Sequence, residues 1–281
     1  MFTTLISTAD LAARLGAPEI VVVDLRHDLG QPDAWGEAQY QAGHVPGAVF
    51  AHLDRDLSAP KTGSNGRHPL PSPAVCAALF GRLGIGAGTQ VVAYDQGSGA
   101  YASRLWWMLR WLGHEAAAVL DGGFDRWTRE GRSVTAEVPV PRPATFTTRP
   151  VVTPVDAAAV ASALGGESML LIDARAPERF RGEVEPLDPV AGHIPGAVNR
   201  PFLRNLGPEG TFKPAAELRA EFDALLGGKP PAVVVHQCGS GVTACHNALA
   251  MEIARLPGAR LYPGSWSEWC ADPARPVARG G

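Results

Sequence analysis

The sequence predicts an α/β protein made of two tandem domains, each a mainly parallel sheet flanked by helices. Short apolar runs alternate with helical patterns along the chain, as in parallel sheets that are covered on both faces. The pattern also occurs twice: VVVDLR at 21–26 returns as LLIDAR at 170–175, and AGHVPGAV at 42–49 returns as AGHIPGAV at 191–198. Both matches have the same offset of 149 residues, so the chain contains an internal duplication.

A proline-rich stretch at 137–154 separates the two copies, and its prolines favour an extended chain without regular backbone pairing. We therefore expect a first domain at 1–138, a linker at 139–151 and a second domain at 152–281.

Each copy follows the same order of elements. A helix with a small polar cap comes first, at 7–16 and again at 153–165, and a buried strand that ends in aspartate follows it. After the GH(V/I)PGA motif come a helix, a second apolar strand, a glycine loop and another helix. This strand and its loop read VVAYDQGSG at 91–99 and VVVHQCGSG at 233–241, which are only 142 residues apart. The second copy therefore has a shorter connection before this strand.

Composition excludes several classes of protein. The 281 residues are 46% hydrophobic and 19% charged with a net charge of -3, which predicts a soluble globular chain without a basic surface for nucleic acid. No apolar run reaches the roughly 18 residues of a membrane span, and the start lacks a signal-peptide pattern, so we expect a cytoplasmic protein. Four cysteines without a CxxC pair fit a reducing compartment. GxGxxG, P-loop and HExxH motifs are absent, so no metal or organic cofactor is expected.

Cys238 directly follows an apolar strand of the second copy, where parallel sheets place their ligand sites. Gly239, Ser240 and Gly241 let the backbone curl so that N–H groups point at the sulfur, and the helix that starts near Thr243 directs its positive end there. Both effects favour a reactive thiolate, although a buried structural cysteine is the alternative. The first copy has Gln96 at the equivalent position, which predicts one catalytic and one inactive domain.

The chain resembles the tandem-domain rhodanese-like sulfurtransferases. The repeated GH(V/I)PGA motif, WWMLRWLGH at 106–114, LDGGFDRW at 120–127 and CGSGVTA after a strand carry this resemblance. It implies two rhodanese-like domains, an inactive first domain and a persulfide on Cys238 of the second. In this family a CGSGxT loop is typical of members that use 3-mercaptopyruvate, whereas CRxGxT is typical of thiosulfate users. The implied reaction moves sulfur from 3-mercaptopyruvate to cyanide or to a thiol such as thioredoxin or a low-molecular-weight thiol.

The same resemblance implies residues for the sulfur donor. Arg179 is the first candidate for the donor carboxylate, and Arg181 is the second. The loop residues expected to contact the donor are Gly239, Gly241, Val242 and Thr243. Users of 3-mercaptopyruvate often carry a further arginine near the place where Leu187 and Asp188 stand here, so thiosulfate stays open as the donor.

A proton relay is also implied, in which a histidine and an aspartate of the first domain act with the loop serine. Here Asp54, His68 and Ser240 are the candidates, and such a group could lend a proton to the leaving enolate. The alternative for His68 is a solvated loop histidine.

Other conspicuous residues have structural interpretations. His44 and His193 both occur in the repeated motif, so we expect them to bond nearby backbone rather than to catalyse. Asp24 and Asp173 are expected to anchor local loops through the arginine two residues later. The residues expected to pack without a chemical role are Trp106, Trp107, Trp111, Trp127 and Cys245, while Cys76 and Cys270 show no functional signal.

Two other functions are alternatives to sulfur transfer by an enzyme. Cysteine phosphatases hold a thiolate in a similar loop, but they need an arginine at the sixth following residue, which is Ala244 here. A persulfide carrier that receives sulfur from another protein is the non-enzymatic alternative.

Overall fold

The computed structural model describes residues 1–281, which form two compact units. The first unit comprises Met1–Ser58, Pro71–Val152 and Pro208–Phe212, and the second comprises Ala59–Leu70, Thr153–Gly207 and Lys213–Gly281. Two short segments therefore belong to a different unit from the residues that flank them in sequence. No sequence pattern indicated that these two segments belong to the other unit. The domain boundaries expected from the sequence stay a prediction.

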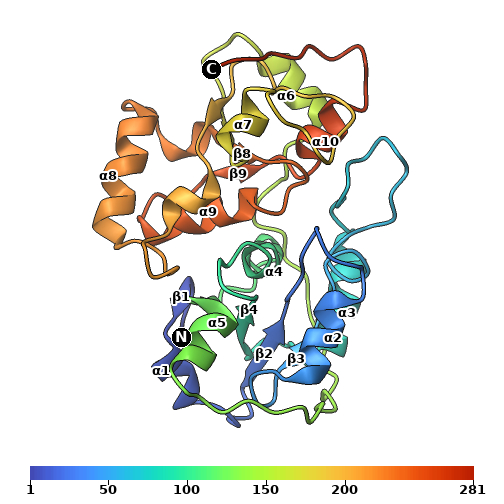
Figure 1. The fold of residues 1–281 in the computed structure, drawn as a ribbon, viewed down its shortest axis with the longest axis vertical. Coiled ribbons are helices and arrows are strands. Elements are labelled where there is room, and N and C mark those ends of the chain that lie inside the picture. The colour runs from blue at the N-terminus through green and yellow to red at the C-terminus, as the bar shows by residue number, and fades with distance from the viewer. The chain divides into compact units, whose positions relative to one another are not determined.

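The first unit contains a five-stranded sheet in the order β1-β5-β4-β2-β3, and every neighbouring pair is parallel. Its strands are β1 (Leu5–Ile6), β2 (Ile20–Asp24), β3 (Val49–Phe50), β4 (Gln90–Tyr94) and β5 (Ala117–Leu120). The longest pairing runs between β2 and β4, from Ile20 opposite Gln90 to Asp24 opposite Tyr94. The carboxyl ends of these two central strands therefore lie side by side (Figure 1).

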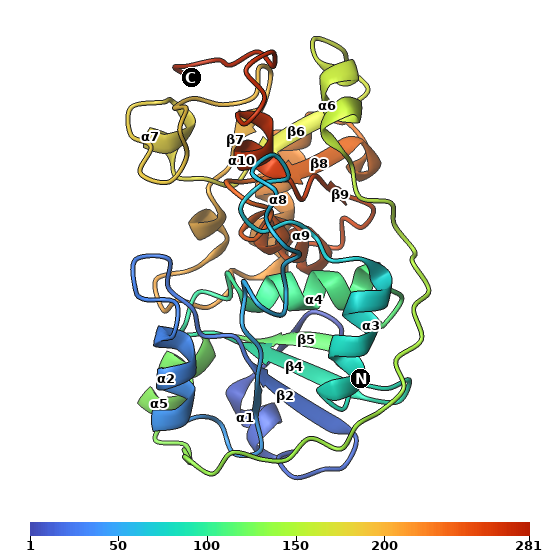
Figure 2. The ribbon, with the colours of Figure 1, turned by 90° about the vertical axis from the view of Figure 1, so that its right-hand side faces the viewer.

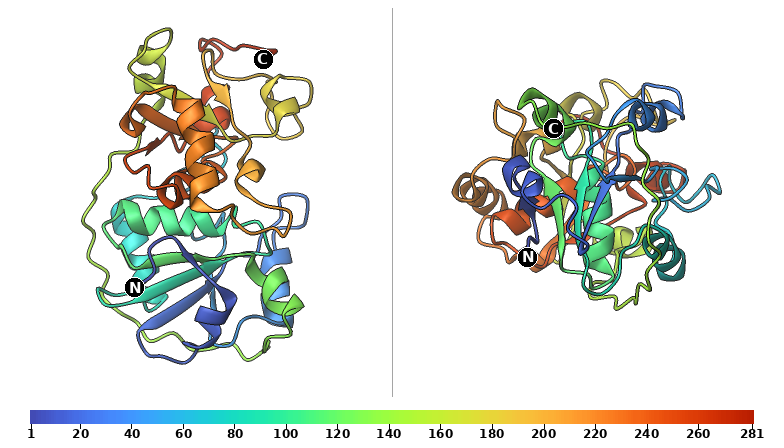
Figure 3. Two further views of the ribbon diagram at one scale, coloured as in Figure 1. Left: turned by 90° about the vertical axis from the view of Figure 1, so that its left-hand side faces the viewer. Right: turned by 90° about the horizontal axis from the view of Figure 1, so that it is seen from below.

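Helices cover both faces of this sheet. They are α1 (Thr8–Ala12), α2 (Trp35–Ala42), α3 (Pro73–Arg82), α4 (Ala102–Trp111) and α5 (Gly123–Arg129). Figures 2 and 3 show α4 along one face and α1 on the other. On the α1 face, Leu11 of α1 and Trp127 of α5 share a buried cluster with Val22, Val92 and Tyr94 of the sheet.

The second unit repeats this arrangement with a four-stranded parallel sheet in the order β7-β6-β8-β9. Its strands are β6 (Leu170–Asp173), β7 (Val198–Asn199), β8 (Val234–Gln237) and β9 (Arg260–Leu261). Its helices are α6 (Ala157–Ala163), α7 (Pro177–Phe180), α8 (Ala215–Leu226), α9 (Ala244–Ile253) and α10 (Ser265–Trp269), with 3-10 turns η1 (Phe202–Asn205) and η2 (Pro231–Val233). Helices α8 and α9 pack on one another, and α6 packs on α10. The two parallel α/β units confirm the predicted fold class.

The start of α1 and the buried tryptophans follow the sequence prediction, whereas α6 begins at Ala157 and not at residue 153. Ser7 caps α1 by accepting a hydrogen bond from the N–H of Asp10, and Asp156 caps α6 by accepting one from Ala159. The tryptophans that were expected to pack, Trp106, Trp107, Trp111 and Trp127, are all buried. None of the helices combines the length and the apolar character that a membrane span requires.

One buried ion pair is repeated in both units. Arg26 binds the carboxylate of Asp24 through Nε and Nη2 at 2.9 and 2.7 Å, and Arg175 binds Asp173 in the same way at 3.0 and 2.7 Å. Each arginine also donates to a backbone carbonyl of the GH(V/I)PGA turn, that of Gly43 or Gly192. The pair therefore joins the end of a central strand to this turn, as the sequence predicted.

The repeated histidines are likewise structural. His44 bonds the carbonyl groups of Tyr40 and Glu137, and His193 bonds that of Phe180. Both rings also stack on an aromatic neighbour, Tyr40 or Phe180.

We predict that Asp173→Asn destabilises the second unit far more than Asp223→Asn. The first change leaves a buried guanidinium without its main counter-charge, which costs about 3 kcal/mol or more, whereas the exposed pair Arg219–Asp223 contributes less than about 1 kcal/mol. Calorimetric unfolding of the two variants beside the unchanged protein measures the difference. Equal melting temperatures for both variants would contradict the anchoring role of Asp173.

Candidate active site

Cys238 lies at the end of β8, and its sulfur is surrounded by backbone N–H groups. The N–H of Gly241 donates to Sγ at 3.1 Å and the N–H of Ser240 lies 3.5 Å from it. The residue is only 2% exposed, and α9 begins after Thr243. A negative charge on this sulfur is thus met by oriented dipoles in place of water, as the loop sequence predicted.

The start of α10 holds the backbone of this loop. The N–H groups of Trp266 and Ser267 donate to the carbonyl oxygens of Cys238 and Gly239 at 3.0 and 2.9 Å. Ser265 accepts from the N–H of Cys238 at 3.1 Å through its hydroxyl group. With its carbonyl groups bound from behind, the loop can direct its N–H groups toward the sulfur.

Gly241 can adopt this loop conformation because it has no side chain. Its φ is +75°, and a Cβ atom there would lie 2.2 Å from the carbonyl oxygen of Pro263. Any other residue would therefore shift the N–H group that makes the shorter contact with Sγ.

Ser240 and His68 form a hydrogen-bonded pair. His68 Nδ1 lies 2.7 Å from Ser240 Oγ, and both residues are buried. His68 belongs to the segment 59–70, which is part of the second unit. The structure thus joins two of the three residues that were predicted to form a proton relay.

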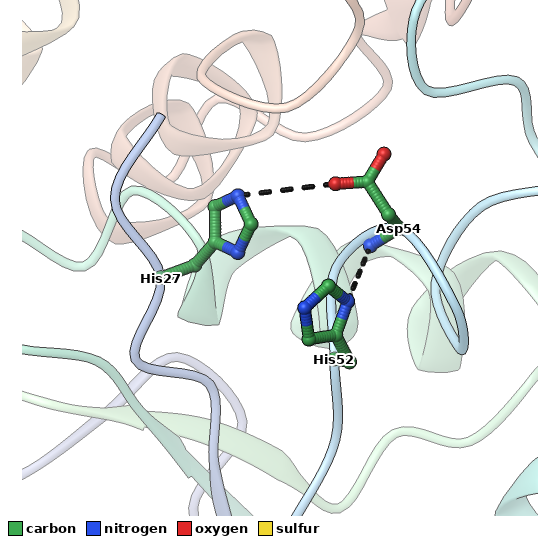
Figure 4. A group of neighbouring side chains, drawn as sticks. All are labelled: His27, His52 and Asp54. Atoms are coloured by element: carbon green, nitrogen blue, oxygen red, sulfur yellow. Dashed lines mark hydrogen bonds and ion pairs between the residues drawn. The ribbon is translucent and has the colours of Figure 1, made fainter. Parts of the chain in front are cut away.

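Asp54, the third predicted member, belongs to the first unit and lies beside two histidines (Figure 4). Its carboxylate is 3.9 Å from His27 Nε2, and the ligand-type atoms of Asp54, His27 and His52 all lie within 4.8 Å of one another. His52 Nδ1 accepts from the N–H of Asp54, while its Nε2 donates to the carbonyl of Asp33. Both ring nitrogens of His52 are hydrogen-bonded to backbone groups, so the cluster is a hydrogen-bonded support for Asp54. A metal ion would have to displace these hydrogen bonds.

The surroundings of His27 favour its neutral form. Burial lowers its pKa, and the nearby His52 lowers it further, against a smaller opposite effect of Asp54. Because the ordinary histidine pKa is already near 6.5, a lowered pKa favours the uncharged ring at neutral pH.

Arg179, the first candidate for the donor carboxylate, lies beside the loop of Cys238. Its guanidinium pairs with Glu185 at 2.6 Å and with Asp188 at 3.4 Å. A Cβ atom at Gly239 would lie 3.5 Å from both terminal nitrogens of Arg179, so the guanidinium is next to the residue that follows Cys238. Arg181 is instead exposed and pairs with Glu183 at 2.7 Å.

Arg67 is a site residue that the sequence analysis missed. Its Nη2 would lie 2.8 Å from a Cβ atom at Gly239, and its Nη1 bonds the carboxylate of Asp188. Its position directly before His68 was the one signal that could have pointed to it.

Buried charge behind the loop is balanced by Arg175. Burial alone would lower the pKa of this guanidinium, but attraction to Asp173 and a hydrogen bond with it, helped by Glu185 and then Cys238, raise the pKa above its ordinary value. Arg175 also lies 3.4 Å from Glu185, which links it to the group that holds Arg179.

The remaining predicted residues take supporting positions. Val242 is buried, and Thr243 is the residue before α9. Cys245 is buried on α9, with its sulfur 3.3 Å from the carbonyl of Gly241. Burial raises the pKa of both Cys76 and Cys270 to about 11, which keeps these thiols protonated.

The equivalent loop of the first unit, between β4 and α4, binds a side chain of its own. Asp95 Oδ1 accepts from the N–H groups of Gly97 and Gly99 at 3.1 and 2.9 Å, and Oδ2 accepts from those of Tyr101 and Ala102 at 2.8 and 3.2 Å. The N–H groups of this loop are therefore directed at a carboxylate that precedes Gln96.

We predict that Gly241→Ala slows alkylation of Cys238 by iodoacetamide about tenfold or more, because the shifted loop loses a hydrogen bond to the charged sulfur. Gly196→Ala is the matched control, since its φ is +79° but a Cβ atom there meets nothing within 4 Å. Peptide mass spectrometry of the alkylated protein gives both rates. Similar rates in the two variants would show that the N–H cradle does not activate Cys238.

Known proteins share both the sequence and the fold. A family model of the rhodanese-like domain matches residues 7–130 and 156–272. The chain is 50% identical over 279 residues to a probable 3-mercaptopyruvate sulfurtransferase of Pseudomonas aeruginosa, with 98% of each chain covered. It is 40% identical over 282 residues to SseB, a putative thiosulfate sulfurtransferase of Mycobacterium tuberculosis, covering 98% of this chain and 97% of the other. The crystal structure of SseA from Escherichia coli, a 3-mercaptopyruvate sulfotransferase, has a TM-score of 0.81 and 34% identity, covering 94% of this chain and 99% of that one. The chain belongs to the rhodanese-like domain family, with one matched region in each half.

Proposed function

We propose that this protein is a sulfurtransferase that moves a sulfane sulfur from 3-mercaptopyruvate to a thiol or cyanide through a persulfide on Cys238. The observation that carries the proposal is the sulfur of Cys238 held by the N–H groups of Ser240 and Gly241, with the Arg179 guanidinium beside Gly239. This arrangement combines a nucleophile with a cation for the donor, and relatives of similar length carry sulfurtransferase names.

In the first half-reaction the Cys238 thiolate attacks the sulfur of 3-mercaptopyruvate. A sulfur–sulfur bond forms, the carbon–sulfur bond of the donor breaks, and its electron pair leaves with the carbon as pyruvate enolate. Cys238 then carries the transferred sulfur as a persulfide. The N–H groups of Ser240 and Gly241 keep the cysteine sulfur in line for this attack.

The enolate needs a proton to become pyruvate. Ser240 Oγ is 2.7 Å from His68 Nδ1, so a hydroxyl proton given to the enolate can be replaced from the histidine. We propose Asp54 as the residue that completes this relay, with His27 and His52 holding its position.

In the second half-reaction a thiolate or cyanide attacks the outer sulfur of the persulfide. The sulfur–sulfur bond breaks, its electron pair returns to Cys238 as thiolate, and the acceptor leaves as a persulfide or thiocyanate. We propose thioredoxin-type proteins or low-molecular-weight thiols as acceptors in a cytoplasmic, reducing setting. Ping-pong kinetics are expected.

Charge balance favours the monoanionic donor over thiosulfate. The guanidinium groups around the loop are those of Arg67, Arg175 and Arg179, and the carboxylates that pair with them are those of Asp173, Glu185 and Asp188. Three positive and three negative charges leave no surplus for a dianion. Thiosulfate is the second candidate, because SseB of Mycobacterium tuberculosis is named for it.

We propose that the first domain has no sulfur-transfer activity of its own. Its loop carries Gln96 where the second has Cys238, and its N–H groups already bind the carboxylate of Asp95. Gly99, the equivalent of Gly241, therefore already donates its N–H to a carboxylate.

We predict that the reduced protein gains one sulfur atom from 3-mercaptopyruvate much faster than from thiosulfate, because the loop lacks charge for a dianion. Intact mass after removal of the donor measures the gain, and cyanide should release it as thiocyanate. Cys238→Ser should gain none, whereas Cys76→Ala should behave as the unchanged protein.

Two outcomes would contradict this assignment. Faster loading from thiosulfate would make the protein a thiosulfate sulfurtransferase. Loading from neither donor, but from a persulfidated partner protein, would make it a persulfide carrier.

We predict that Ser240→Ala slows sulfur uptake from 3-mercaptopyruvate on the order of 100-fold, which is the usual contribution of a positioned proton donor. Uptake from thiosulfate should change far less, because its leaving group is sulfite, which needs no proton on carbon. Rapid-quench measurement of pyruvate and sulfite compares the two donors in one protein. An equal loss with both donors would assign Ser240 to loop structure and not to proton transfer.

A further inference from the structure

We infer that Arg67 acts with Arg179 to bind the carboxylate of the sulfur donor, and so selects short acids that carry one carboxylate. This inference rests on the proposed function of Cys238. It adds a specificity-determining residue from the segment 59–70, which lies far from the loop in sequence.

The backbone of Arg67 is fixed against the same elements that hold the active-site loop. Its N–H donates to Ser267 Oγ at 3.0 Å, and the N–H of Ser267 donates to the carbonyl of Gly239. Just before it, a Cβ atom at Gly66 would lie 2.9 Å from the carbonyl oxygen of Gly264. The segment therefore lies directly on the start of α10, and Arg67 enters the site from a defined position.

The two guanidinium groups meet at Gly239. A Cβ atom at this residue would lie 2.8 Å from Arg67 Nη2 and 3.5 Å from both terminal nitrogens of Arg179. Gly239 directly follows Cys238, and its missing side chain leaves room between the guanidinium groups and the nucleophile. A carboxylate two or three bonds away from a reacting sulfur can reach them both, which fits 3-mercaptopyruvate.

The acids behind the guanidinium groups are buried, whereas the guanidinium groups are partly open. The side chains of Asp188 and Glu185 are 2% and 3% exposed, while those of Arg67 and Arg179 are 23% and 18% exposed. Asp188 contacts both arginines, one on each oxygen. Asp188 is therefore a shared counter-charge that orients the two guanidinium groups. Their outer N–H donors stay accessible to a solute.

This balance also explains the preference for a single carboxylate. A guanidinium that is paired on one side keeps hydrogen-bond donors but little net charge, so it recognises a carboxylate by geometry more than by long-range attraction. The site therefore lacks the surplus positive charge that a dianion such as thiosulfate would require.

The test compares Arg67→Ala and Arg67→Lys with Arg219→Ala, a matched change on the exposed face of α8. Loss of a charge-assisted hydrogen bond predicts a rise of about tenfold or more in KM for 3-mercaptopyruvate in Arg67→Ala, with a smaller change in kcat. Arg67→Lys should recover only part of this loss, because an ammonium lacks the planar fork. Arg219→Ala should match the unchanged protein.

A second readout does not depend on sulfur transfer. Iodoacetate and iodoacetamide both alkylate Cys238, but only iodoacetate carries a carboxylate. The ratio of their rates should fall severalfold in Arg67→Ala and stay unchanged in Arg219→Ala. An unchanged ratio in Arg67→Ala would overturn the inference.

The double variant Arg67→Ala/Asp188→Asn separates binding from charge neutralisation. If Arg67 only compensates the buried Asp188, removing both charges should restore the KM and the alkylation ratio to those of Asp188→Asn alone, which would overturn the inference. If Arg67 contacts the donor, the double variant should keep the defect.

Failure of the proposed function would look different. In that case the unsubstituted protein takes no sulfur from 3-mercaptopyruvate, while the Arg67→Ala variant still loses the preference for iodoacetate. This pair of results would overturn the proposed donor but support Arg67 as a carboxylate-binding residue.

Discussion

The arrangement of the second unit depends on one constraint: the sulfur of Cys238 lies in a place that water barely reaches, so its hydrogen bonds must come from the protein. Cys238 is 2% exposed, so the N–H groups of Ser240 and Gly241 have to replace its hydration. These groups point inward only because α10 binds the loop carbonyls from the other side and Gly241 fits against Pro263. The parallel sheet supplies the frame, since β8 ends where β6 and β9 support it on both sides.

The duplicated fold meets the same constraint in two ways. In the second unit the N–H groups of the loop face the sulfur of Cys238, whereas in the first they bind the carboxylate of Asp95. Burial raises the pKa of Asp95, and hydrogen bonds from four backbone N–H groups offset part of this rise. A loop of this kind can therefore keep its conformation without a cysteine, because a carboxylate of the same chain accepts hydrogen bonds from its N–H groups.

The sequence was sufficient to predict what is local or periodic. Strand and helix patterns predicted the two α/β units, the GH(V/I)PGA repeat predicted structural roles for His44 and His193, and the strand–Cys–glycine pattern predicted the N–H cradle of Cys238. Arg67 could not be found in this way, because its contact with Gly239 joins a loop without periodicity to a residue far along the chain. Asp188 stands near the place where the family resemblance implies a further arginine, and in the structure it is the carboxylate that holds both Arg67 and Arg179.

The presence of Asp188 changes how the site must be understood. An arginine alone beside a buried nucleophile would attract any anion, and it would also stabilise the thiolate so strongly that its reactivity would fall. Pairing each guanidinium with a buried carboxylate removes most of this general attraction and keeps the directed N–H groups. Affinity then depends on whether a ligand can present a carboxylate at the right distance from the sulfur that Cys238 attacks. In the proposed reaction, selectivity for the donor follows from the acidic residues that lie behind the arginines as much as from the arginines themselves.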